Sequence, residues 1–162
     1  MFDTIVFIII NAVTSFDYFK SDDKKAKEIL DNYGLTLDER FELTYKCTYI
    51  YSYMYVFEVD DFSINLDDVS FYSNSSTNLE LFEETCKNKL ISFKELMNVN
   101  DEYKDYSLPF DEEYYYLYAF RNRHNSQSII YDISYIGQYS TSEIYAIYFP
   151  NEKQLITFVS ID

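Results

Sequence analysis

The chain has 162 residues, with 28 Asp and Glu against 13 Lys and Arg, and its formal net charge is −15. This charge opposes approach to phosphate backbones and anionic lipid surfaces, so it argues against nucleic acid and membranes as partners. Hydrophobic residues make up 48% of the chain and aromatic residues 20%, a composition that excludes an intrinsically disordered protein. One hydrophobic core suffices at this length, and we expect a single domain over residues 1–162.

An apolar run opens the chain, and residues 4–10 within it predict a buried strand. The run is too short to cross a bilayer, which takes about 20 apolar residues. Asp3 also stands where a signal peptide carries positive charge. We therefore expect a cytoplasmic protein, with a secreted or lipid-anchored bacterial domain that lacks its signal peptide as the alternative.

A helix is predicted over about residues 22–33, because Ser21 can cap it, its first turn is acidic and Gly34 can end it. The segment 41–59 then carries an apolar or aromatic side chain at every odd position, which is the periodicity of a strand. One strand of that length would be exceptional, so we expect a bulge or turn near residues 47–50 to divide it in two.

The second helix is predicted over about residues 78–97, where Thr77 and Glu80 form a capping box ahead of apolar residues at helical spacing. The rest of the chain predicts four strands, at about 113–120, 128–136, 143–149 and 154–160. Their short connections favour an antiparallel C-terminal meander and leave no room for crossover helices. The fold class is therefore α+β, in two layers: a mostly antiparallel sheet of about six or seven strands, with both helices packed on one face.

Cofactor and metal motifs are missing from the sequence. Gly34 and Gly137 are the only glycines, so no glycine-rich phosphate loop can form, and no zinc or calcium motif occurs. The lone His124 lies in a polar segment, 121–127, that is typical of a hairpin turn and only secondarily of a small cationic site. We expect no cofactor, no metal and no enzymatic activity.

The two cysteines, Cys47 and Cys86, lie far apart and fit no close metal-ligand spacing. Each is in phase with apolar neighbours, as expected for a small core residue. Free buried thiols are favoured, and one disulfide is the alternative.

The most unusual feature is a tyrosine-rich stretch at 114–118 that directly follows three carboxylates. Tyrosines occupy both parities of this stretch, so a core on one face of the sheet cannot receive them all; the alternative is a sheet covered on both faces, together with the codon bias of a GC-poor gene. Tyrosine is enriched at interface hot spots, and carboxylates attract a cationic partner. The predicted partner-binding residues are Asp60, Asp61, Asp111, Glu112, Glu113, Tyr114 and Tyr116.

These features predict a small acidic binding protein that inhibits or neutralises a basic protein partner. In size, acidity and lack of catalytic motifs it is similar in general character to toxin-immunity proteins and to inhibitors that mimic nucleic acid. The alternative is a small-molecule-binding domain, or an enzyme without a recognisable motif, whose pocket is lined by tyrosines and carboxylates.

Overall fold

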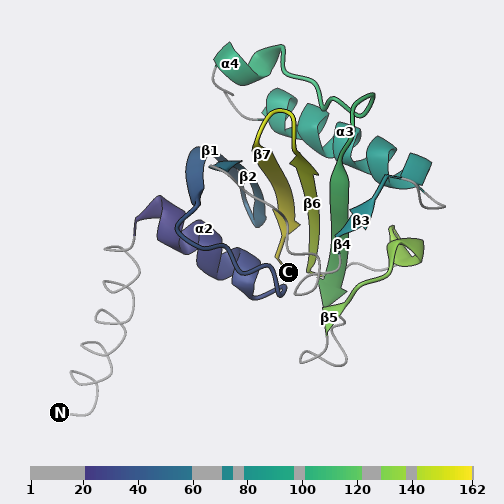
Figure 1. Cartoon of the computed structure of the whole chain (residues 1–162), viewed down its shortest axis with the longest axis horizontal. Coiled ribbons are helices and arrows are strands. Elements are labelled where there is room, and N and C mark those ends of the chain that lie inside the picture. The colour runs from purple at the N-terminus through teal and green to yellow at the C-terminus, as the bar shows by residue number, and fades with distance from the viewer. Residues whose placement is uncertain are drawn as a thin grey trace.

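The computed structural model describes residues 21–59, 71–74, 79–96, 101–121, 129–137 and 142–161 (Figure 1). The described strands are β1 (Phe41–Tyr49), β2 (Ser52–Val59), β3 (Tyr72–Ser73), β4 (Tyr115–Arg121), β5 (Ile129–Ile130), β6 (Glu143–Phe149) and β7 (Gln154–Ser160). They form one antiparallel sheet with the order β1-β2-β7-β6-β4-β3, and β5 pairs with β4. Two main helices, α2 (Asp22–Asp31) and α3 (Leu79–Leu96), pack against this sheet, which confirms the α+β class.

Helix α2 (Asp22–Asp31) begins at the predicted residue and ends two residues before the predicted end at 33. The Ser21 side chain accepts a hydrogen bond from the backbone N–H of Lys24, which satisfies one of the unpaired donors of the first turn. Gly34 has a φ of 78°, the left-handed conformation that reverses the chain after a helix. The next residue, Leu35, returns its N–H to the carbonyl of Leu30 at 3.1 Å.

Residues 41–59 form the hairpin of β1 and β2, so the predicted division of this segment is confirmed. The strands pair from Phe41↔Val59 to Tyr49↔Ser52, and Ile50 and Tyr51 make the turn. A shift in register between Leu43 and Tyr45 marks a bulge in β1. Because of this bulge, odd-numbered side chains before and after it point to opposite faces of the sheet.

Helix α3 (Leu79–Leu96) agrees with the predicted helix to within one residue at each end, and it buries Phe82, Cys86, Leu90 and Phe93. Thr77 of the predicted capping box, and the predicted strand at 4–10, lie outside the described residues. Cys47 and Cys86 are free and buried, as expected. None of the described helices is long and apolar enough to cross a membrane.

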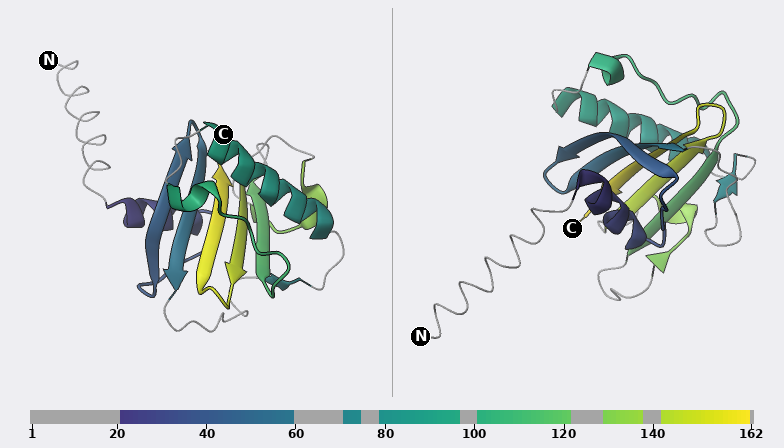
Figure 2. Two further views of the ribbon diagram at one scale, coloured as in Figure 1. Left: turned by 90° about the horizontal axis from the view of Figure 1, so that it is seen from above. Right: turned by 60° about the vertical axis from the view of Figure 1, so that its left-hand side comes forward.

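The two helices pack on opposite faces of the sheet, so the predicted placement of both on one face is corrected. One buried cluster joins α3 to the side chains of Met54, Tyr116, Ile147 and Phe158, and the other joins α2 to their strand neighbours, including Tyr55, Leu117, Ala146 and Val159. The right-hand view of Figure 2 shows α3 above the sheet and α2 below it. The physical reason is that β4, β6 and β7 are almost continuously apolar, which is the pattern of strands covered on both faces.

The C-terminal meander also needs correction. The expected strand at 128–136 is only the two-residue β5 followed by a 3-10 turn, η1 (Ile133–Tyr135), where the Asp132 carboxylate accepts the N–H of Ser134. Strand β4 therefore pairs directly with β6, with Leu117 opposite Ala146. The last hairpin, β6 and β7 around the turn at 150–153, forms as predicted.

Candidate functional site

Three of the predicted carboxylates, Asp111, Glu112 and Glu113, are exposed on the segment that leads into β4. The Glu112 carboxylate accepts a hydrogen bond of 3.0 Å from the side-chain amide of Asn151, which lies in the β6–β7 turn. This contact joins two segments that are distant in sequence. Asp60 and Asp61, also predicted for partner binding, lie outside the described residues.

The β6–β7 turn adds a fourth exposed carboxylate, Glu152. Its pKa is raised above the ordinary value, first by partial burial and then by the negative charge of Glu112. Carboxylates from the two segments therefore lie near one another. We call Asp111, Glu112, Glu113 and Glu152 the acidic edge.

The predicted contact tyrosines Tyr114 and Tyr116 are buried, with exposed fractions of 1% and 2%, so their side chains lie in the core and not on a contact surface. The hydroxyl of Tyr114 donates to the carboxylate of Glu83 at 2.6 Å, and the ring of Tyr116 packs against Phe82 with centroids 4.9 Å apart. Burial, followed by the bond to Glu83, raises the pKa of Tyr114. Both side chains point to the face of the sheet that α3 covers, which explains their burial. Tyr115, of the opposite parity, packs against the cluster of the other face, as expected for a sheet covered on both faces.

A cavity of about 370 Å³ lies on the flank of α3 that faces away from Glu83 and Tyr114. We call it the α3 pocket. Helix α3 contributes Thr85, Asn88, Lys89, Ser92, Phe93 and Leu96 to its wall. The sheet contributes Tyr49, Ser52, Phe158, Val159 and Ser160. Unlike the predicted pocket of tyrosines and carboxylates, its described lining includes one tyrosine and no carboxylate, and it offers hydroxyl groups and a lysine beside aromatic rings.

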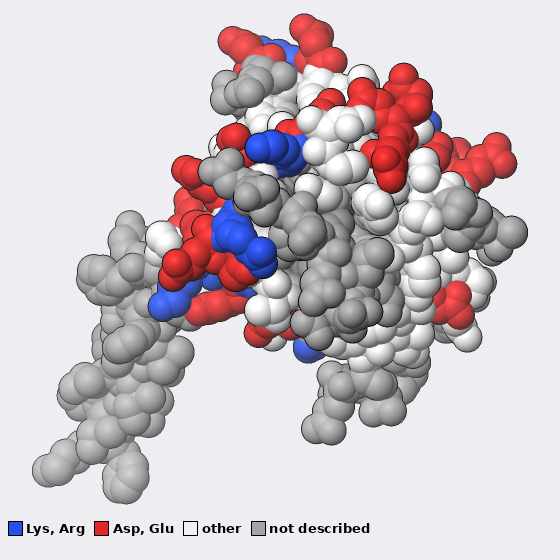
Figure 3. All heavy atoms as spheres, in the orientation of Figure 1, with Lys and Arg blue, Asp and Glu red and all other residues white. Residues whose placement is uncertain are grey.

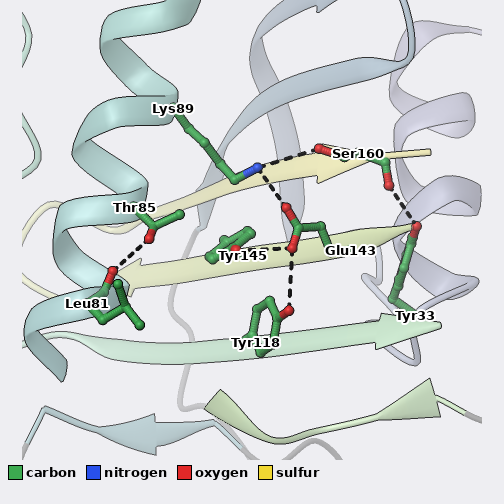
Figure 4. Close-up of polar contacts among 8 residues, drawn as sticks. All are labelled: Tyr33, Leu81, Thr85, Lys89, Tyr118, Glu143, Tyr145 and Ser160. Atoms are coloured by element: carbon green, nitrogen blue, oxygen red, sulfur yellow. Dashed lines mark hydrogen bonds and ion pairs between the residues drawn. The ribbon is translucent and has the colours of Figure 1, made fainter. Parts of the chain in front are cut away.

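Lys89 is held at the pocket wall by a network on the α3 face of the sheet (Figure 4). Its ammonium group lies 2.9 Å from one carboxylate oxygen of Glu143 and 3.5 Å from the hydroxyl of Ser160. It also lies 4.7 Å from the ring centroid of Tyr145, within the range of a cation–π contact. Both members of the ion pair are largely buried, with 23% and 16% of their side chains exposed.

The second carboxylate oxygen of Glu143 accepts hydrogen bonds from the hydroxyls of Tyr145 at 3.0 Å and Tyr118 at 3.4 Å. Burial, followed by the charge of Glu143, raises the pKa of both tyrosines, so they stay protonated and act as donors. Three donors from α3, β4 and β6 thus fix the carboxylate. The carboxylate in turn fixes the position of Lys89.

The α3 wall of the pocket also presents acceptor atoms. The Thr85 hydroxyl donates to the carbonyl of Leu81 at 2.7 Å, and the Ser92 hydroxyl donates to the carbonyl of Asn88 at 2.9 Å. Because each hydroxyl proton is already used, the remaining lone pairs of both oxygens can accept hydrogen bonds from a ligand. The pocket can therefore receive both a donor and an acceptor.

Sequence reasoning did not identify Lys89 and Glu143. A signal was present for Lys89, which falls three residues after Cys86 and four before Phe93 on the apolar face of α3. A charge in that position predicts a buried partner. The sequence gives no indication that the partner is a residue 54 positions away in β6.

The basic turn at 121–127 is described only at Arg121, and His124 lies outside the described residues. The Arg121 guanidinium donates to the backbone carbonyl of Asn32, and it lies 5.6 Å from the ring centroid of Tyr33. These contacts attach β4 to the end of α2, which is a structural role. In the described part of the chain no group of three or more His, Cys, Asp or Glu side chains is placed to hold a metal ion.

No protein-family model matches the chain, and neither a curated protein nor a solved structure matches it. The site is therefore interpreted from its own geometry.

Proposed function

We propose that the domain binds a basic protein through the acidic edge and thereby inhibits it. The observation that carries the proposal is the convergence of exposed carboxylates from two segments, which the 3.0 Å hydrogen bond from Asn151 to Glu112 holds together. Neighbouring carboxylates of the acidic edge repel one another, and a lysine or arginine side chain from a partner would offset this repulsion. The binding free energy of a cationic partner gains from this relief.

The distribution of charge over the rest of this surface favours the same class of partner. In Figure 3, carboxylate atoms crowd the region over α3 and the segment that precedes β4, with few cationic atoms beside them. The net charge of −15 accelerates the encounter with a basic protein through long-range attraction. A nucleic-acid-binding protein fits this chemistry, because carboxylates can occupy the places of phosphates.

The test compares two triple variants that remove equal charge. One, Glu112→Gln with Glu113→Gln and Glu152→Gln, neutralises the acidic edge. The control, Glu39→Gln with Glu42→Gln and Glu58→Gln, neutralises exposed glutamates near the β1–β2 hairpin. Tagged proteins are used to capture partners from the native host at low and moderate salt, and captured proteins are identified by mass spectrometry.

A basic partner should be captured by the wild type and the control, and less of it should remain as salt rises. With the purified partner, the edge variant should associate about tenfold more slowly than the control. Equally slow association of both variants with the partner would show that total charge, and not the position of the acidic edge, determines binding, and it would contradict the proposal. Capture of no basic protein by the wild type would overturn the proposal.

A further inference from the structure

Two exposed apolar side chains line the α3 pocket, and two more occupy the turn that directly follows one of them. Tyr49 and Leu96 line the pocket and are themselves exposed, and Ile50 and Tyr51 follow Tyr49 in the β1–β2 turn. Ile50 and Tyr51 are 68% and 67% exposed. Aromatic and large aliphatic side chains grouped in this way beside a pocket are typical of the centre of a protein interface.

The backbone at Ile50 gives a second, independent reason to assign this turn to binding. Ile50 has a φ of 52°, a left-handed conformation that is unfavourable for a β-branched residue. Two-residue hairpin turns use Asn or Gly for such a position. An exposed isoleucine there gains little from the domain's own core, so its side chain is available to a partner.

We propose, on the basis of the function proposed above, that the α3 pocket receives one apolar anchor side chain from a cationic segment of the basic partner. The rings of Phe93 and Phe158 contribute to the apolar part of the pocket, together with Leu96 and Val159. Its volume of about 370 Å³ is at the lower end of the range for ligand sites, which suits one large side chain with its own backbone.

The polar atoms of the pocket complement a peptide backbone. Lys89 has three N–H donors, of which Glu143 and Ser160 accept two, so a donor remains for a carbonyl group of the anchor segment. The lone pairs of the Thr85 and Ser92 hydroxyls accept its N–H groups. A peptide supplies both kinds of group at every residue.

The charges around the pocket favour a cationic segment. On α3, Glu84 precedes the lining residue Asn88 by four positions and Glu95 follows Ser92 by three, so each carboxylate is a surface neighbour of the pocket wall. Both glutamates are exposed. Lysines or arginines on either side of the anchor can reach them.

Helix α3 separates the pocket from the acidic edge and is narrow enough for one partner to cover both. The flank of α3 away from the pocket contacts the chain segment that precedes β4 and contains Asp111, Glu112 and Glu113. There the Glu83 carboxylate accepts a hydrogen bond from the Tyr114 hydroxyl, and Lys94 donates to the backbone carbonyl of Tyr106. A side-chain-bearing helix is about 10–12 Å across. A partner of ordinary size that lies over α3 therefore meets both surfaces.

The experiment uses two capped peptides as probes, Lys-Lys-Phe-Lys-Lys and Lys-Lys-Ala-Lys-Lys, and the small molecule 3-phenylpropionate. Binding to the whole chain is measured by calorimetry and by ligand-observed NMR. Ser92→Phe introduces a ring at the pocket wall, and Ile91→Phe adds the same ring at an exposed position of α3 outside the lining. Circular dichroism verifies that both variants are folded.

We expect the phenylalanine peptide to bind at least about tenfold more tightly than the alanine peptide. Ser92→Phe should remove this difference, and Ile91→Phe should preserve it. Equal binding of both peptides, or binding of neither, overturns the anchor proposal, while capture of a partner through the acidic edge still supports the proposed function. Binding of 3-phenylpropionate without any preference between the peptides would assign the pocket to small molecules and also overturn the proposal.

Discussion

Lys89 and Glu143 illustrate how a charged pair can be kept inside an aromatic core. The carboxylate receives the ammonium group and two tyrosine hydroxyls, so each of its oxygens has a donor. Such a pair contributes little net stability compared with apolar residues, but removing one partner leaves a largely buried charge without compensation. The pair therefore fixes position more than it adds stability.

Replacement of Lys89 by Met should lower the free energy of unfolding by about 1–3 kcal/mol, because Glu143 loses its cation. The double variant Lys89→Met with Glu143→Gln should recover most of that loss. Urea unfolding of the two single variants and the double variant gives the coupling free energy. The exposed pair Lys46–Asp22, 2.7 Å apart, is the control, and its loss should cost less than about 1 kcal/mol. Equal losses at both pairs would contradict the argument.

Residue-level prediction from the sequence succeeded where the signal is local and failed where it depends on a neighbouring element. Ser21 and Gly34 act at the predicted ends of α2, because capping and left-handed conformation involve only adjacent backbone. Tyr114 and Tyr116 were assigned to a surface, and they are buried because α3 covers the face to which they point. Alternation gives the relative direction of side chains in a strand, but not whether a second layer covers each face.

At the scale of the elements, the β1–β2 hairpin combines regular pairing with an unfavourable turn. The strands pair in register on either side of the bulge, and the turn contains neither Gly nor Asn. The absence of these turn residues explains why the sequence could only place a break near residues 47–50. At residues 128–136 the sequence predicts a full strand, and this prediction is wrong. The apolar residues there favour a strand, but hydrogen bonds between Asp132 and Ser134 form a local turn.

Replacement of Ile50 by Gly should stabilise the hairpin by up to about 1 kcal/mol, because glycine adopts the left-handed conformation without a steric penalty. The replacement removes little buried apolar surface, since the Ile50 side chain is mostly exposed. Thermal unfolding measures the effect. Tyr51→Gly is the matched control in the same turn, and it should not stabilise the protein. A lower melting temperature for Ile50→Gly would show that the isoleucine contributes to the fold after all.

At the scale of the whole molecule, the sheet has two covered faces, and tyrosines are buried on both of them. Burial is the largest cause of the raised pKa values of Tyr55, Tyr106, Tyr114, Tyr118 and Tyr145. These residues belong to different strands and loops and to both faces of the sheet. Their protonation is therefore coupled to the integrity of the fold as a whole.

Alkaline pH should unfold the protein cooperatively. Tyrosines in the unfolded chain ionise near pH 10, whereas these five tyrosines, four of them buried and Tyr106 half-buried, resist ionisation in the folded state. Above about pH 10 the unfolded state therefore holds fewer protons, and stability falls as pH rises; below pH 10 these groups leave stability unchanged. Tyrosinate absorbance and near-ultraviolet circular dichroism, followed together, should change in one shared transition. Gradual ionisation of all tyrosines with constant circular dichroism would contradict the prediction.

The position of β7 has a consequence for how the chain acquires its structure during synthesis. β7 lies between β2 and β6, yet it follows every other described strand in the sequence. A ribosome adds about 5–20 residues per second, so several seconds pass between the appearance of Val59 and that of Gln154. During this interval the β1–β2 hairpin has no strand to join on its inner side, and its open edge is exposed to other chains. We therefore expect the nascent chain to be most prone to aggregation in the interval before β7 emerges and covers this edge.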